Sequence, residues 1–368
     1  MNVDPSRIAI FRLGHIGDTV VALPALWTVR KRFPKAHIVY LTQEDRAGKL
    51  AQGTEVLRKG TVFDDLLVYK LGADGVSRAE ILRTLTNLRR QKIDMVVYIP
   101  PFRSKEQLDR DATFFRLAGI QKIVGMQGYR ETEYRPGGVP LPTVAHEADI
   151  LLGHLARDGV STPEDPISLM DFGFSEEERS LARSWVEAHE IDLKKPVIGF
   201  APCSKMASKI WPGDRFGEVL RTLDAEYDPT FIAFGGPSDL SGCQTLCNGV
   251  SRSINTAGQL TVRQSAAILE YCTMHLGVDT GVMHLAAAVG TPCVAIFSAR
   301  DWPGRWAPYG KGHIVHRAAV PCEGCMLEVC DRGNECMLWI SSEQVMKSAR
   351  TVLERERSGS RSLKLQVG

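Results

Sequence analysis

The chain has 368 residues, 44% of them hydrophobic and 24% charged, and its formal net charge is +2. This length suits two domains of moderate size, and the composition excludes a disordered chain. The small net charge excludes a strongly basic surface for nucleic acid, and no apolar run is long enough to span a membrane. The N-terminus lacks the layout of a signal peptide, and nine cysteines without an export signal predict a cytoplasmic protein without disulfides.

Short apolar segments alternate with amphipathic ones along the whole chain, which is typical of parallel α/β sheets. In the first half a helix is predicted at Asp18–Phe33. A capping-box pair, Ser77 with Glu80, predicts another helix that ends near Gln91. The strands predicted in this half are Arg7–Phe11, His37–Thr42, Val62–Tyr69, Met95–Ile99 and Ile123–Met126.

A second series of the same kind begins after the polar stretch Ser161–Pro166. Ser175 and Glu178 form a capping box for a helix that ends near His189. The strands predicted in the second series are Val197–Phe200, Phe231–Phe234, His275–Val278 and Cys293–Phe297.

These elements predict two Rossmann-like domains, at residues 1–170 and 171–340, that face each other across a cleft. Ligands of such folds bind at the carboxyl ends of the strands. A final helix at residues 341–357 comes after the second sheet is complete, and from chain order we expect it to pack back on the first domain. The polar tail, residues 358–368, is predicted to be frayed.

The first strand runs directly into the segment Arg12–Asp18, with the sequence R-L-G-H-I-G-D. Gly14 and Gly17 allow a tight turn between strand and helix. The segment is not G-x-G-x-x-G, and the chain has no G-x-x-x-x-G-K-[ST], which disfavours a dinucleotide oxidoreductase and a P-loop enzyme. Asp18 is either an N-cap or a carboxylate placed to take a proton from a hydroxyl group.

The segment Asp279–His284, with the sequence D-T-G-V-M-H, follows a predicted strand and opens a helix of small residues. Free N–H groups and the positive end of the helix dipole attract phosphate at such a start. His284 lies about one turn beyond Thr280 and Gly281, and therefore near the same rim. The alternative is that Asp279 only caps the helix and that His284 is an ordinary surface or core histidine.

Two further loops follow strands of the second domain. After Ala201, the hydroxyl group of Ser204 and backbone N–H groups can contact phosphate, and Lys209 adds a positive charge; the alternative is a solvated surface loop. The turn Gly235–Asp239 ends in a carboxylate, Asp239, that can bind the hydroxyl pair of a ribose.

Together, the R-L-G-x-I-G-D start, the A-P-x-S…K-x-W-P loop, the G-G-P turn, Asn255–Gly258 and D-T-G-x-x-H-L-A-A-A-x-G-T-P resemble glycosyltransferase family nine. The likeness covers essentially the whole chain, and this family contains the ADP-heptose:lipopolysaccharide heptosyltransferases. It implies a GT-B fold and inverting, metal-independent transfer of a heptose-like sugar. The implied donor is an ADP-sugar, and the implied acceptor is a lipopolysaccharide core or a related glycan or glycolipid, at the inner face of the inner membrane.

The resemblance also implies roles for individual residues. Asp18 is expected to be the general base, and Lys209 the residue that neutralises the diphosphate. The donor-site loop implied by the match comprises Asp279, Thr280, Gly281 and His284. His15, Cys203 and Gln259-Leu260 depart from the family pattern, and the last two leave the identity of the donor open.

Four of the nine cysteines lie close together in the spacing C-x2-C-x4-C-x5-C: Cys322, Cys325, Cys330 and Cys336. Four thiolates can hold a structural zinc or iron ion, but this spacing matches neither a zinc ribbon nor a ferredoxin motif. Packed free thiols are the alternative. No cofactor is expected for catalysis itself.

The acceptor side is predicted from basic residues after a strand end. Arg103 and Lys105 can contact an anionic acceptor, or they can be solvated loop residues. Two other functions stay open on the same fold: a nucleotide-sugar epimerase, and a protein that binds a nucleotide sugar without turnover. The presence of both Asp18 and Lys209 disfavours the second.

Overall fold

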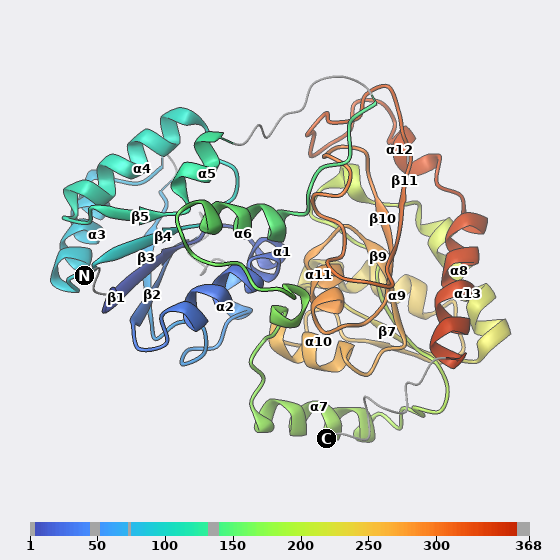
Figure 1. Ribbon diagram of the computed structural model, residues 1–368. Coiled ribbons are helices and arrows are strands. Elements are labelled where there is room, and N and C mark those ends of the chain that lie inside the picture. Colours follow the sequence, from blue (N-terminus) through green and yellow to red (C-terminus); the bar gives the residue numbers. More distant parts are fainter. Residues whose placement is uncertain (1–3, 45–51, 73–74, 132–139, 359–368) are drawn as a thin grey trace. The chain divides into compact units, whose positions relative to one another are not determined.

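The structure, a computed structural model, describes residues 4–44, 52–72, 75–131 and 140–358 (Figure 1). It divides into two compact units, residues 1–136 with 147–173 and residues 137–146 with 174–368. A single boundary was predicted, whereas the short segment that ends at His146 belongs to the second unit. It does so because Leu141 N–H donates to Glu323 Oε1 at 2.6 Å and Val144 N–H to the Pro303 carbonyl at 2.9 Å. The predicted tail, residues 358–368, lies outside the described residues except for Ser358.

The first unit is built on a five-stranded parallel sheet in the order β3-β2-β1-β4-β5. Its central strand is a run of buried apolar residues, as expected where helices cover both faces of a parallel sheet. The strands are β1 (Arg7–Phe11), β2 (His37–Glu44), β3 (Asp65–Lys70), β4 (Met95–Tyr98) and β5 (Lys122–Val124). The helices are α1 (Ile16–Val21), α2 (Leu23–Arg32), α3 (Arg78–Arg90), α4 (Lys105–Leu117), α5 (Met126–Glu131) and α6 (Glu147–Arg157).

The single helix predicted at Asp18–Phe33 is two helices that meet at Ala22. Pro24 lies in the first turn of α2. Because proline has no N–H group, it cannot donate the bond that would continue α1 through this point.

The capping box predicted at Ser77 and Glu80 is half formed. Ser77 Oγ accepts from the Glu80 N–H, but the Glu80 carboxylate accepts from the N–H of Lys70 and not from the N–H of Ser77.

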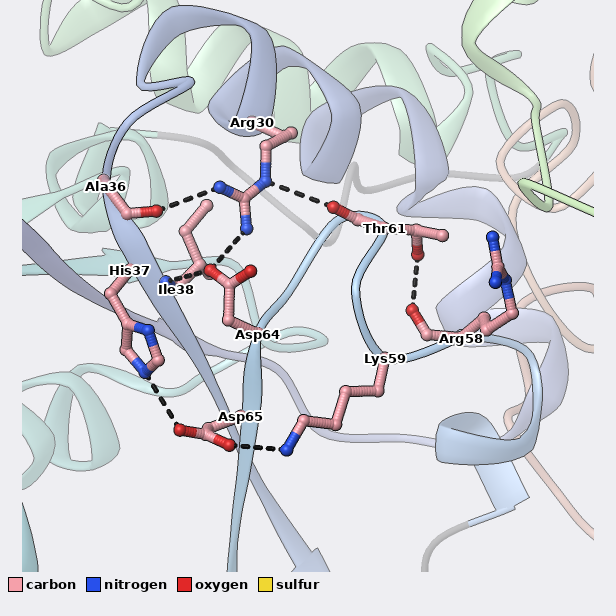
Figure 2. Close-up of polar contacts among 9 residues, drawn as sticks. All are labelled: Arg30, Ala36, His37, Ile38, Arg58, Lys59, Thr61, Asp64 and Asp65. Carbon is pink, nitrogen blue, oxygen red and sulfur yellow. Dashed lines mark hydrogen bonds and ion pairs between the residues drawn. The ribbon is translucent and has the colours of Figure 1, made fainter.

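Strand β3 starts three residues later than predicted because the preceding residues form a turn, whose polar contacts are drawn in Figure 2. Asp64 Oδ2 accepts from the Ile38 N–H at 2.8 Å and from Arg30 Nη2 at 2.7 Å. Asp65 bonds to His37 at 3.0 Å and to Lys59 at 2.7 Å. These contacts tie the end of α2, the start of β2 and the turn before β3 together.

The second unit is built on a six-stranded parallel sheet in the order β11-β10-β9-β6-β7-β8. Its strands are β6 (Val197–Ala201), β7 (Thr230–Ala233), β8 (Ser253–Asn255), β9 (Met274–Val278), β10 (Cys293–Phe297) and β11 (Ile314–Arg317). Its helices are α7 (Glu176–Ala188), α8 (Gly213–Tyr227), α9 (Leu240–Cys247), α10 (Val262–Leu269), α11 (Gly281–Ala288), α12 (Glu335–Leu338) and α13 (Ser342–Ser358). Strands β8 and β11 were not predicted.

The expectation that the final helix packs back on the first domain is wrong. Helix α13 lies beside α8 (Figure 1), and Val345, Ala349, Val352 and Leu353 are buried in the core of the second unit. Their spacing of four, three and one residues places them on one helical face. That face packs on the apolar side of the second sheet, and so α13 completes this unit.

The strand order reverses direction once in each sheet, between β1 and β4 and between β6 and β9. The carboxyl ends of the strands on either side of such a reversal leave room for a ligand, because their connecting helices lie on opposite faces. The functional loops of each unit are therefore expected at these two places. Among the described residues, no helix is both long and apolar enough to cross a bilayer.

The capping box that starts α7 gives a prediction about acid stability. A hydrogen bond from Arg263, together with bonds from Ser175, lowers the pKa of the Glu178 carboxyl to about 2. Stability from this carboxylate is therefore complete above about pH 4.5 and is lost as the pH falls toward about 2. We expect Glu178→Gln to lower the free energy of unfolding by about 1–2 kcal/mol at pH 7, with the difference disappearing near the acid end.

Chemical denaturation followed by circular dichroism at several pH values measures this difference. Glu176→Gln is the matched control, because Glu176 lies in the same helical turn with a side chain that is 83% exposed. A loss for Glu178→Gln that stays constant between pH 7 and pH 3 would contradict the assignment.

Candidate functional site

In the first unit, the loop after β1 carries Asp18 to the start of α1. The N-cap of α1 is His15 and not Asp18. Asp18 is the third helical residue, and its Oδ2 accepts from the His15 N–H at 2.8 Å, as the third residue of a capping box does. The residue is half-buried, and it lies where the strand order reverses. The capping and proton-accepting interpretations are therefore compatible, since a carboxylate has a second oxygen.

Gly14 is required by the position of Asp18. Its φ is +118°, a conformation that L residues with a side chain rarely adopt. A Cβ atom at Gly14 would lie 2.5 Å from the Asp18 Cβ and 2.7 Å from its Oδ2. The glycine therefore leaves the space that the aspartate side chain fills.

Arg12 holds the same loop through hydrogen bonds to the backbone. The sequence did not predict this role. Its side chain is fully buried, Nη1 donates to the Ile99 carbonyl at 2.6 Å, and Nη2 donates to the Asp18 carbonyl. One guanidinium thus joins the ends of β1 and β4 to α1. The position of an arginine directly after a buried strand could have indicated a structural role. Its partners could not be predicted, because they are backbone carbonyls and belong to no sequence motif.

In the second unit, Lys209 and Asp279 come together although 70 residues separate them in the sequence. Lys209 follows β6, Asp279 follows β9, and Lys209 Nζ lies 2.6 Å from Asp279 Oδ2. Both side chains are largely buried, at 16% and 9% exposed. A buried ammonium group needs a negative partner, and Asp279 supplies it in the structure.

The first turn of α11 lies directly beyond this pair. Thr280 is its N-cap in extended conformation, and Gly281 is its first helical residue. The Thr280 hydroxyl is buried and, among the described residues, has no hydrogen-bond partner. His284 is buried one turn later, with its ring edge-on to Trp306 at 6.4 Å between centroids. The start of α11 therefore places the Thr280 hydroxyl, a potential hydrogen-bond donor, close to Lys209.

Ser204 and Asp239 are both engaged in local turns. Ser204 Oγ accepts from the Met206 N–H at 3.2 Å, and Asp239 Oδ2 accepts from the Gly236 N–H at 2.8 Å. Asp239 thereby holds the turn that follows β7. The adjacent Gly258 has φ +74°, and a Cβ there would meet Pro237 at 2.9 Å, so these two loops pack closely. Donor contacts by Ser204 and Asp239 stay predictions.

The two predicted acceptor residues lie in different environments. The Arg103 side chain is 15% exposed, and its Nε lies 3.6 Å from Asp111 Oδ2. The Asp111 carboxylate also accepts from the Tyr98 hydroxyl at 2.8 Å, and burial followed by this carboxylate raises the pKa of Tyr98. Lys105, the first residue of α4, is exposed. An acceptor would meet Lys105 without rearrangement, whereas Arg103 would have to leave Asp111.

The four clustered cysteines line one small cavity in the second unit: Cys322, Cys325, Cys330 and Cys336. In the part of the chain that the structure describes, no group of three or more His, Cys, Asp or Glu side chains is placed to hold a metal ion as it stands. The described residues therefore do not support the predicted structural metal.

The chain is similar to known proteins in sequence and in structure. The family model described as glycosyltransferase family 9 (heptosyltransferase) matches residues 104–335. Lipopolysaccharide heptosyltransferase 3 of Escherichia coli K12 is 22% identical over 92% of this chain and 96% of that protein.

Two solved structures are similar over nearly the whole chain. The family 9 glycosyltransferase from Veillonella parvula has a TM-score of 0.69 at 24% identity, and the match covers 96% of this chain and 99% of the other. The ADP-heptose lipopolysaccharide heptosyltransferase II of E. coli has a TM-score of 0.68 at 18% identity, with coverage of 95% and 99%. This likeness confirms the predicted GT-B fold class.

The geometry at Gly14 can be tested by substitution. We expect Gly14→Ala to lower the free energy of unfolding by about 2–4 kcal/mol, because it combines backbone strain with a collision against Asp18. Gly60→Ala is the control: its φ is +85°, and no atom lies within 4 Å of a Cβ there. It should cost only the backbone strain, about 1 kcal/mol. Urea denaturation of both variants measures the difference, and equal losses would contradict the close approach to Asp18.

Proposed function

The chain belongs to glycosyltransferase family 9, the heptosyltransferases, and we propose that it transfers a heptose-like sugar with inversion from an ADP-sugar to a lipopolysaccharide core or related glycan. It is thus a glycosyltransferase of lipopolysaccharide biosynthesis. The observation that most supports the proposal is the Lys209–Asp279 pair in front of α11, at the strand reversal of the second unit. The named substrate of the similar E. coli heptosyltransferase II supports ADP-heptose as the donor class.

The second unit would bind the donor diphosphate. Lys209 and the N–H groups at the start of α11 lie together, and both attract an anion. When the bond from the anomeric carbon to the diphosphate breaks, negative charge grows on the departing ADP. Donors already in place stabilise that charge most in the transition state. No cofactor is needed for this role, since protein groups supply the positive charge.

Asp18 of the first unit would act as the general base. The acceptor hydroxyl oxygen attacks the anomeric carbon, the diphosphate leaves, and the hydroxyl proton passes to the Asp18 carboxylate. A carboxylate is a weak base toward a neutral hydroxyl. The proton therefore transfers late, after bond formation to carbon has made the hydroxyl acidic. Arg12, bonded to the Asp18 carbonyl, positions this residue.

Other assignments belong to the same proposal. Thr280, Gly281 and His284 form the donor turn, and Lys105 contacts an anionic acceptor. The protein acts in the cytoplasm and meets its acceptor at the inner face of the inner membrane. A nucleotide-sugar epimerase is the alternative reaction. Incubation with donor alone separates the two, because an epimerase converts the sugar without an acceptor.

The role of Asp18 predicts a separation of binding from turnover. Asp18→Asn should lower kcat by about 10²–10⁴, the usual contribution of a general base, while ADP binding changes little. Asp4→Asn is the control, because Asp4 is exposed and pairs with Arg32 on the surface of the same unit. Steady-state kinetics and calorimetric titration with ADP measure the two quantities. Near-normal turnover of Asp18→Asn would remove the residue from the base role.

The role of Lys209 predicts a loss of nucleotide binding. ADP and ADP-sugars should raise the melting temperature of the wild-type protein more than UDP compounds do. Lys209→Ala should weaken ADP at least tenfold, since it removes a charge-assisted contact to the diphosphate. Lys205→Ala, an exposed lysine of the same loop, should keep the wild-type affinity. Equal ADP affinity for all three proteins would rule out the proposed diphosphate site.

A further inference from the structure

Two cysteines of the second unit lie against each other beside the candidate donor loop. Cys203 follows β6 in the loop that carries Ser204 and Lys209, and Cys243 belongs to the first turn of α9. Both are free thiols, and their side chains share a hydrogen bond. Cys203 is partly exposed, whereas Cys243 is fully buried. An accessible thiol is thus in contact with a protected one.

Gly242 makes this contact possible. A Cβ atom at Gly242 would lie 2.9 Å from Cys203 Sγ, which is closer than Cβ atoms come to such a neighbour. The sulfur atom of Cys203 therefore lies close to the backbone of the first turn of α9, beside the residue that precedes Cys243. A side chain at position 242 would displace this sulfur atom from the turn.

The surroundings of Cys203 favour its thiolate form. The hydrogen bond from Cys243 lowers the pKa of the Cys203 thiol, although burial and the Asp239 carboxylate act in the opposite direction. The positive end of the α9 dipole acts with the hydrogen bond, because no side chain of the described residues caps this helix start. The thiolate is the nucleophilic form of a cysteine, so Cys203 is the reactive member of the pair.

Cys243 keeps its proton. The hydrogen bond with Cys203 raises the pKa of the Cys243 thiol, and burial raises it further. Another acceptor within its reach is the neutral Phe234 carbonyl, 3.9 Å from Cys243 Sγ. A thiolate is the stronger acceptor, so the Cys243 proton is directed at the Cys203 sulfur. Cys243 can therefore deliver a sulfur atom and a proton to Cys203, while burial protects it from reagents in solution.

We propose that Cys203 is a site of oxidation by hydroperoxides, and that the Cys243 thiol then displaces the oxygen to form a disulfide. In the first step the Cys203 sulfur attacks the peroxide, an S–O bond forms, and the O–O bond breaks. The sulfur loses two electrons to the peroxide, and the departing oxygen takes a proton from solvent and leaves as water or an alcohol. In the second step the Cys243 sulfur attacks the sulfenic sulfur. The S–O bond breaks, and the hydroxyl group leaves as water with the Cys243 proton.

The disulfide changes the candidate donor loop. Bonded sulfur atoms are about 2 Å apart, so bond formation draws Cys203 closer to α9. Ser204 follows Cys203 directly, and its hydroxyl holds the turn that leads to Lys209 by accepting from the Met206 N–H. Oxidation therefore weakens nucleotide binding until a dithiol reduces the bond. This consequence rests on the proposed function, whereas oxidation of the cysteine pair does not.

Mass spectrometry of the full, reduced chain after treatment with hydrogen peroxide tests the proposal. The wild-type protein should yield a Cys203–Cys243 disulfide. In Cys243→Ser the reaction should stop at the sulfenic acid of Cys203, which dimedone traps, and Cys203→Ser should give neither product. The matched control is Cys247→Ser, because Cys247 is buried one turn further along α9, and this variant should still form the disulfide.

Alkylation gives a second readout that needs no oxidant. Cys243→Ala removes the hydrogen bond that favours the thiolate, so iodoacetamide at pH 7 should alkylate Cys203 several-fold more slowly than in the wild-type protein. Cys247→Ala should leave that rate unchanged. A peroxide-treated wild-type protein without the Cys203–Cys243 disulfide would overturn the proposal. Equal alkylation rates in the wild-type protein and Cys243→Ala would overturn the activation of Cys203 by its neighbour.

The effect on the donor loop has its own result. Peroxide should weaken ADP binding several-fold in the wild-type protein and in Cys247→Ser but not in Cys203→Ser, and dithiothreitol should restore the affinity. Unchanged ADP affinity of the disulfide form would overturn this effect. If the reduced protein does not bind ADP but the disulfide forms, the proposed donor fails while the oxidation site stands.

Discussion

The reversal of strand order in each parallel sheet is the constraint on which the rest of the structure depends. Parallel strands must be joined by crossovers, and the direction of crossing changes between β1 and β4 and between β6 and β9. The helices that follow the two strands at each reversal lie on opposite faces of the sheet, so they leave the loops at these strand ends accessible. Asp18 follows one of these strands, and the Lys209–Asp279 pair comes from the loops after β6 and β9. Within the second unit, the strand order thus brings Lys209 and Asp279 together although they are distant in sequence.

On the proposed assignments, the same side chains serve local stability and chemistry in these loops. Asp18 bonds back to the N–H of His15, the N-cap of α1, and Asp239 holds its own turn, so each carboxylate has a structural role. A carboxylate fixed by one oxygen is already oriented, and it loses less freedom when the other oxygen meets a substrate. Gly14 and Arg12 also fix the position of Asp18: Gly14 leaves space for its side chain, and Arg12 bonds its backbone carbonyl.

Much of the fold was predictable because buried parallel strands are unbroken apolar runs. Strands such as Arg7–Phe11 and Cys293–Phe297 were predicted at their observed bounds. Strand β8 is three residues long and partly polar, and β11 is an edge strand with two basic residues, so neither has that signal. The docking of α13 and the role of Arg12 depend on contacts between distant segments, which periodicity does not encode. The pairing of Lys209 with Asp279 followed from motif positions only once the strand order was known.

The Lys209–Asp279 ion pair has a consequence for the end of the catalytic cycle. In the proposed cycle the diphosphate takes the place of the Asp279 carboxylate beside Lys209, and the carboxylate returns when the nucleotide departs. The exchange lowers the net affinity for spent nucleotide, since only the difference between two ion pairs is gained. On the proposed assignment, the aspartate shortens the residence time of the product and limits inhibition by accumulated ADP.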